Sequence, residues 1–280
     1  ILVPATAAVV GLGNPWWTIQ IYALLNVACW GLLGWLLYHQ IPQTDRYAIF
    51  RWLGCMFSLG ILDSVRQSLV DLPAILLLVL AVNRHSQARS GQSALWGALA
   101  SLAKETSLLA LIALHAGETR PSRNWRRIGL VLLASAVPIT AWSIYVHWRF
   151  AGVPETGLGN FTWPLVGLGR QVTTCVRELF AGNFDSRYSF GLLGIAGLAA
   201  QALSLWRHRS LESPWWRIGL VYSILMLFLS SWVWSGYWAA CRAVLPMTIA
   251  FNLLLPGSRR FWPWWIAGNL AMLHGVWRFL

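Results

Sequence analysis

The chain has 280 residues, of which 57% are hydrophobic and only 11% charged, and its net charge is +12. Several apolar runs approach the roughly 20 residues that a helix needs to cross a bilayer, which excludes a soluble globular protein. We attribute the positive charge to arginines in short cytoplasmic loops beside anionic lipid headgroups, and not to nucleic-acid binding.

Apolar segments follow one another along the whole chain and predict one transmembrane domain over residues 1–280. They predict an all-α, polytopic transmembrane helix bundle of about 9–11 membrane segments. The segments cover approximately residues 1–13, 18–38, 47–63, 68–82, 93–116, 128–147, 189–206, 218–234, 241–255 and 261–279.

The segment Ser93–Ala116 is apolar except at its middle, where the only lysine of the chain, Lys104, precedes Glu105. A straight span here would place the basic loops on its two sides at opposite membrane faces, against the positive-inside rule. A break at Lys104–Glu105 into two short helices that rise and return places both basic loops in the cytoplasm. We therefore predict a broken pair, with Lys104 near the outer surface. A charge at such depth is costly and usually faces a cavity, a partner or a substrate; the alternative is a structural pair with Glu105.

Residues 148–188 form the only long loop, which we predict to lie at the outer face. Within it, Val172, Cys175, Val176 and Leu179 have the spacing of an amphipathic helix. Such a helix lies along the membrane surface or, as an alternative, packs against the bundle.

This topology gathers polar residues at the outer ends of the segments. Three of them are cations, and arginine and lysine there suit an anionic group such as a lipid phosphate or pyrophosphate. The alternatives are simple salt bridges, of Arg66 with Asp63 or of Lys104 with Asp71. The full set is Asp63, Arg66, Asp71, Lys104, Glu105, His147, Tyr237 and Arg242.

The passage from Val65 to Leu109 resembles the central module of the GT-C glycosyltransferases, polytopic enzymes that use polyprenyl-phosphate sugars and include the protein O-mannosyltransferases. An Arg followed by Asp-x-Pro opens a span (Arg66, Asp71, Pro73), a basic turn follows, and a small-residue helix ends in Lys104. The later sequence CRAVLPMTIAFNLLLP, with Arg242, is similar to a late-span pattern of the same families.

The resemblance implies glycosyl transfer at the outer membrane face, with an acidic general base and with Lys104, Arg66 and Arg242 on the phosphate of the donor. The principal acid of the family lies in the first outer loop, yet residues 1–16 contain no Asp or Glu. We therefore expect that acid upstream of Ile1, in a portion lacking here, or a chain that is not a working transferase. Asp71 and Asp63 are substitute acids, although Asp71 could also cap its helix. Glu105, Tyr237 and His147 are supporting residues.

The expected partners are a polyprenyl-phosphate-linked sugar donor and membrane lipid, in a multi-pass protein of the bacterial inner membrane. Two other functions stay open: a transporter or flippase for an anionic lipid-linked substrate, and a non-catalytic subunit of envelope glycopolymer assembly. The four cysteines and six histidines are too dispersed to predict a metal site. The sequence indicates no cofactor and leaves open a divalent cation, the sugar, the acceptor and the oligomeric state.

Overall fold

The computed structural model describes residues 2–115, 121–150 and 158–279. In these ranges the regular structure is helical, with 16 α-helices, one 3₁₀ turn (η1, Leu158–Asn160) and an isolated antiparallel bridge between Phe161 and Leu229. The predicted all-α fold is therefore confirmed.

The chain divides into two compact units, which are described separately. The first comprises residues 1–40, 64–153 and 211–218, and the second comprises residues 41–63, 154–210 and 219–280. Helices α4 (Leu59–Arg66) and α11 (Pro214–Leu227) each contribute residues to both units. The assignment of residues 1–280 to one transmembrane domain stays a prediction.

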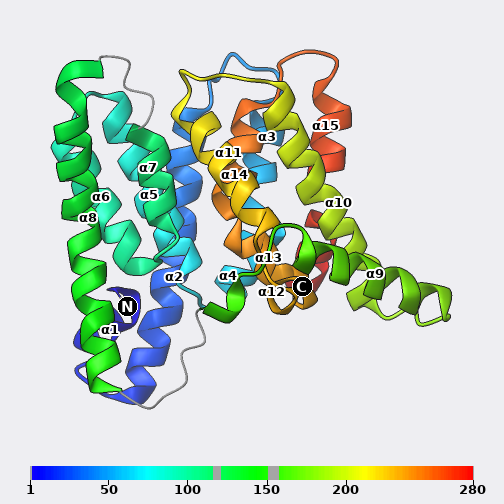
Figure 1. Ribbon diagram of the computed structural model, residues 1–280, viewed down its shortest axis with the longest axis horizontal. Helices are drawn as coiled ribbons and strands as arrows, with labels where there is room; N and C mark the ends of the chain where they lie inside the picture. Colours follow the sequence, from blue (N-terminus) through cyan, green and yellow to red (C-terminus); the bar gives the residue numbers. More distant parts are fainter. Residues whose placement is uncertain (1, 116–120, 151–157, 280) are drawn as a thin grey trace. The chain divides into compact units, whose positions relative to one another are not determined.

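The first unit is built around the neighbouring helices α5 and α6, against which α2, α7 and α8 also pack (Figure 1). Pro138 lies inside α8. The helices are α1 (Leu2–Val10), α2 (Pro15–Gln40), α5 (Asp71–Ser86), α6 (Ser90–Ala103), α7 (Ser107–His115) and α8 (Pro121–Arg149).

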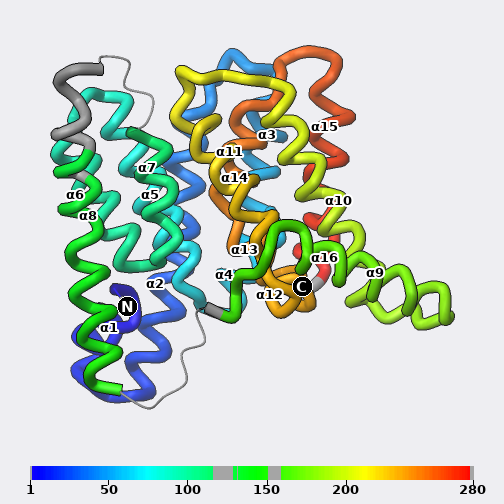
Figure 2. The backbone as a smooth tube through the Cα atoms, in the orientation of Figure 1, coloured from blue at the N-terminus to red at the C-terminus, as the bar shows by residue number. Residues whose placement is uncertain are grey.

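The predicted break at Lys104–Glu105 is present. Helix α6 ends at Ala103, and Lys104 follows in an extended conformation before α7 begins at Ser107. Helix α7 then returns along α6, as the tube in Figure 2 shows. The return depends on Gly97, because a Cβ atom there would lie 2.3 Å from the side chain of Leu111.

The two ends of this helical group differ in their chemistry. Asp71 begins α5 and Lys104 follows α6, so both lie at one end. At the other end, the rings of His85 and His115 are 5.1 Å apart. There Arg217 donates hydrogen bonds to the main-chain carbonyls of Ala113 and Leu114, which lie in the last turn of α7.

The second unit consists of short helices around α10, which packs against α9, α13, α14 and α15. In Figure 1, α9 runs across the direction of α14. Beyond its residues of α4 and α11, the helices are α3 (Ala48–Met56), α9 (Val166–Phe180), α10 (Ser186–Arg207), α12 (Ser231–Ser235), α13 (Tyr237–Ala243), α14 (Leu245–Leu254), α15 (Phe261–Gly268) and α16 (Met272–Phe279).

Small residues and buried amides hold the helices of this unit together. A Cβ on Gly197 would lie 3.4 Å from the main-chain oxygen of Gly268, which accepts a hydrogen bond from the amide of Gln201 at 2.7 Å. The amides of Asn252 and Asn269 donate to each other at 3.0 and 3.2 Å. Close glycine contacts and interhelical polar bonds are the usual means of helix packing in a bilayer, where hydrophobic burial supplies little drive.

Two helices in the described ranges, α2 and α10, are long and apolar enough to cross a membrane. Two bent pairs, α3–α4 at 46° and α13–α14 at 66°, raise this number to four if each is one span. This is fewer than the 9–11 segments predicted, because most predicted segments are shorter helices, such as α5 with 16 residues and α11 with 14. The length and composition of these two to four helices suit a multi-pass membrane protein.

Candidate functional site

The predicted site residues fall into two groups, one in each unit. Asp71, Lys104, Glu105, Arg66 and His147 belong to the first unit. Asp63, Arg242 and Tyr237 belong to the second. The structure brings together one carboxylate and one cation in each group, and the pair of the first unit lies at the break between α6 and α7.

In the first unit, the ammonium of Lys104 donates to the carboxylate of Asp71 at 2.5 Å. The two side chains are 20% and 11% exposed, so a polar pair lies near the surface at the end of an apolar helical group. Asp71 is the first residue of α5. Its carboxylate accepts a hydrogen bond from Lys104, so the salt bridge between Lys104 and Asp71 that the sequence offered as an alternative is observed.

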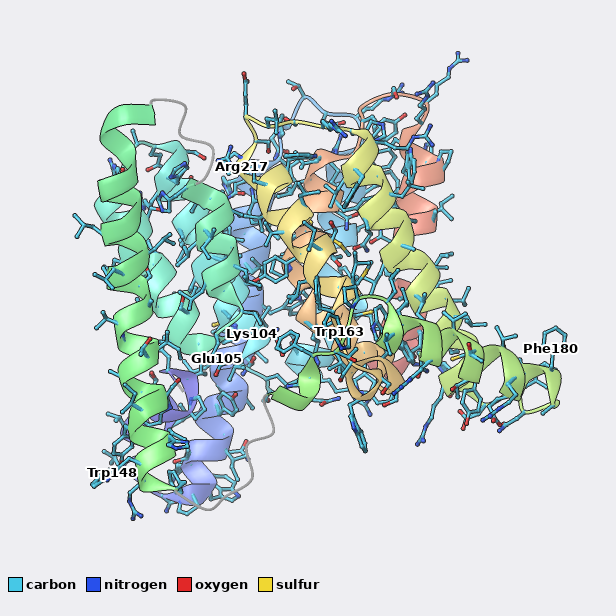
Figure 3. All side chains as sticks on the ribbon, viewed as in Figure 1. Lys104, Glu105, Trp148, Trp163, Phe180 and Arg217 are labelled. Atoms are coloured by element: carbon cyan, nitrogen blue, oxygen red, sulfur yellow. The ribbon has the colours of Figure 1, made fainter. Side chains whose placement is uncertain are left out.

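The break in the helix is what allows this pairing. Lys104 adopts φ −150° and ψ 122°, which is extended backbone, and its N–H still bonds to the carbonyl of Ala100. Figure 3 shows Lys104 and Glu105 together at the connection between α6 and α7. Glu105 is exposed, and the carboxylate paired with Lys104 comes from Asp71 on another helix.

In the second unit, Nε of Arg242 lies 3.5 Å from a carboxylate oxygen of Asp63. The carboxylate is almost completely buried, at 2% exposure, and the guanidinium is 19% exposed. Asp63 lies on the second arm of the α3–α4 pair and Arg242 on the first arm of the α13–α14 pair. The predicted alternative of a bridge from Asp63 to Arg66 is replaced by this contact, since Arg66 is exposed and makes no ion pair with the described residues.

A pocket of about 350 Å³ in the second unit has walls that sequence reasoning largely missed. Of its residues, only Tyr237 was expected at a site. Its ring lies against the α10 backbone, where a Cβ on Gly194 would come within 3.0 Å of it. The pocket is lined by Ser186, Arg187, Tyr237, Trp238, His274 and Trp277.

The sequence holds one sign of this pocket, which is the spacing of residues along two helices. His274 precedes Trp277 by three residues, and Trp238 precedes the predicted site residue Arg242 by four, so each pair shares one side of a helix. The sequence could not show that α13 and α16 lie together. Their contact appears as a Tyr237–His274 ring separation of 5.6 Å.

The remaining predicted residue, His147, is exposed on α8 and is not part of either ion pair. Within residues 2–115, 121–150 and 158–279, no three His, Cys, Asp or Glu side chains gather closely enough to hold a metal ion. The candidate chemistry of the described residues is therefore that of carboxylates, cations and an aromatic pocket.

Comparison of the chain with protein-family models, with curated proteins and with solved structures found no match.

Proposed function

We propose that this protein is an integral-membrane glycosyltransferase of the GT-C type. It moves a sugar from a polyprenyl-phosphate donor to an acceptor at the outer, periplasmic face of the bacterial inner membrane. The observation that supports this most is the Asp71–Lys104 pair, a carboxylate and a cation held together at a helix break in an apolar helical group. Ionisable residues in such surroundings are costly and usually serve a site.

The pair supplies the two groups that the transfer needs. The carboxylate of Asp71 accepts the proton of the acceptor hydroxyl, whose oxygen forms the new bond to the anomeric carbon. The bond from that carbon to the phosphate oxygen breaks, and its electron pair leaves with the polyprenyl phosphate. Lys104 stabilises the negative charge of this leaving group.

The Asp71–Lys104 ion pair also accounts for the stability of the site before substrate arrives. Without a partner, either charge would be expensive in a partly buried position. The donor phosphate competes for Lys104 and thereby releases Asp71 to act as a base. In the second unit, Arg242 and Asp63 repeat the same combination of a cation and a carboxylate.

The test measures release of polyprenyl phosphate from a panel of polyprenyl-phosphate sugars by the full-length protein in liposomes. We expect Lys104→Met and Asp71→Asn each to lower turnover at least about 100-fold, the usual effect of removing a group that stabilises transition-state charge. Arg84→Gln is the matched control, because Arg84 lies at the opposite end of α5 and bonds to Gln87.

The double variant Asp71→Asn/Lys104→Met separates catalysis from stability, because it removes both charges and leaves neither one unpaired. We expect it to fold and to be inactive. Full activity in either single variant, or no transfer from any donor by the unaltered protein, would contradict the proposed function. Movement of the donor across the bilayer without transfer would favour a flippase.

A further inference from the structure

The pocket of the second unit combines aromatic walls with a cation at its edge. The rings of Tyr237 and Trp238 are 5.3 Å apart at 69°, and those of His274 and Trp277 are 6.0 Å apart at 73°. The rings of each pair are steeply inclined and do not stack on one another, and all four line the cavity. Its volume, about 350 Å³, is at the lower end of the roughly 300–1,000 Å³ of ligand pockets and suits one ring with a substituent.

The buried side of the pocket is closely packed. Tyr237 is 1% exposed and His274 is 5% exposed, and the ring of His274 lies 4.1 Å from that of Phe190. Gly191 and Gly194 leave room on α10 for the ring of Tyr237. By contrast, Trp277 is 65% exposed and offers its indole to an incoming ligand.

The polar groups lie at the start of α10, a helix of 22 residues. Asp185 caps this helix by accepting the N–H of Arg187 at 2.9 Å, and it also accepts the hydroxyl of Ser186 at 3.3 Å. The guanidinium of Arg187 is exposed and takes part in no ion pair with the described residues. It is therefore available for a phosphate group, whose oxygens match its planar fork.

We propose that this pocket binds a sugar ring that carries a phosphate group. The aromatic walls contact the faces of the sugar ring. The hydroxyl of Ser186, the imidazole of His274 and the indole of Trp277 bond to the hydroxyls of the sugar. Arg187 binds the phosphate. The choice of a sugar over another anionic ring rests on the proposed function. Trp238 and Arg242 are four residues apart on α13, so the Asp63–Arg242 pair lies about 6 Å further along that helix.

The test is a calorimetric titration of the full-length protein in nanodiscs of phosphatidylcholine. The probes are a hexose 1-phosphate, the same hexose without phosphate, and inorganic phosphate alone. We expect the hexose 1-phosphate to bind at least about 10-fold more tightly than either fragment, because both parts of the pocket are then used. A second titration with the hexose 1-phosphate uses nanodiscs that also contain the polyprenyl-phosphate hexose, and it identifies the source of the sugar phosphate. Loss of the binding heat assigns the pocket to the lipid-linked sugar phosphate. Unchanged binding heat assigns it to the free sugar phosphate.

The variants have matched controls in the same unit. We expect Trp277→Ala to weaken binding of the hexose 1-phosphate about 10-fold, and Arg187→Gln to remove the preference over the neutral hexose. Trp232→Ala and Arg177→Gln alter a tryptophan and an arginine that are also exposed but lie outside the pocket, and these variants should bind the hexose 1-phosphate as the unaltered protein does.

Equal binding of the pocket variants and their controls, or no binding of the hexose 1-phosphate, would overturn this proposal. The proposed function is judged separately, because Lys104→Met removes transfer but leaves this binding intact. Binding without any transfer activity would refute the function and retain the pocket. Transfer activity, together with an unaltered affinity of Trp277→Ala for the hexose 1-phosphate, would refute the pocket and retain the function.

Discussion

At the scale of single residues, the two ion pairs at the candidate sites join residues that are remote in sequence. Lys104 pairs with Asp71 although Glu105 is adjacent to it, and Asp63 pairs with Arg242 although Arg66 is only three residues away. Adjacent residues on a helix point in different directions, so Glu105 is poorly placed to neutralise Lys104. The partners come from helices that packing brings together.

Arg51 is the most buried arginine with a described partner, and its contacts predict a pH dependence of stability. Burial of the carboxylate acts to raise the pKa of Asp45, but the Tyr47 N–H and the Arg51 guanidinium outweigh it and hold that pKa below its ordinary value. A carboxyl group whose pKa is lower in the folded protein than in the unfolded chain contributes to stability at pH values above its pKa in the unfolded chain, about 4. This contribution is lost as the pH falls through the pKa of the group in the folded protein.

Asp45→Asn should therefore lower the free energy of unfolding by about 1–3 kcal/mol at pH 7, since Arg51 keeps only its bonds to the carbonyls of Asn252 and Leu253. The variant should also lose less stability than the unaltered protein between pH 5 and pH 3. Denaturant unfolding in detergent micelles measures both effects. Glu178→Gln, which alters an exposed pair with Arg177, is the control and should change stability by less than about 1 kcal/mol. A pH profile unaltered by Asp45→Asn would refute this account.

At the scale of the elements, breaks and glycines position the polar groups. The break after Ala103 turns one apolar segment into two short helices and places the half-buried Lys104 between them. Gly97 and Gly268 then allow helices to approach closely, because a Cβ at either position would meet a neighbouring side chain at 2.3 Å. The predicted outer loop does contain the helix α9, with Gly167, Gln171 and Cys175 buried along one side. Its placement at the membrane surface stays a prediction.

The contact of α3 with α14 gives a test at this scale. A Cβ on Gly54 would lie 2.1 Å from Oδ1 of Asn252, which accepts the bond from Asn269. Gly54→Ala should destabilise the protein by about 1–3 kcal/mol through overpacking and loss of that bond. Gly31→Ala, at an open position of α2, should be neutral or stabilising by up to about 1 kcal/mol. Equal thermal stability of the two variants would mean that the α3–α14 contact is not formed as described.

At the scale of the whole molecule, the polarity of the first unit predicts its orientation in the membrane. Helix α5 has 16 residues and is about 24 Å long, so Asp71 and Lys104 are separated from Arg84 and Arg89 by nearly the apolar thickness of a bilayer. The positive-inside rule places the arginine end in the cytoplasm. The ion pair then lies at the outer face. The second basic loop, residues 117–127, lies partly outside the described residues.

Cysteine accessibility tests this orientation. In a Cys29→Ser background, Glu105→Cys should react with an impermeant maleimide added outside intact cells, because Glu105 is exposed at the break. Arg89→Cys, exposed at the other end, should react only after the membrane is opened. The three remaining cysteines are buried and supply the background control. Reaction of Glu105→Cys only from the cytoplasmic side would reverse the proposed topology and remove the outer-face site.

The sequence by itself determined the features that depend on local composition and periodicity. Apolar runs with few charges imply helices in a membrane, and the basic loops on both sides of the Lys104 segment, through the positive-inside rule, implied the break that is observed. The spacing within residues 166–180 likewise indicated the helix α9. These conclusions hold because the cost of exposed backbone or of a charge in an apolar layer is set by the residue and its immediate neighbours.

Only the tertiary structure decided which side chains meet. The pairing of Arg242 with Asp63 joins residues 179 positions apart. The aromatic pocket likewise joins α10, α13 and α16. Sequence spacing carries no information on such contacts, because they depend on how helices cross and on where glycines let them approach. The division into two compact units has the same origin, since it reflects contacts between segments that are remote in the chain.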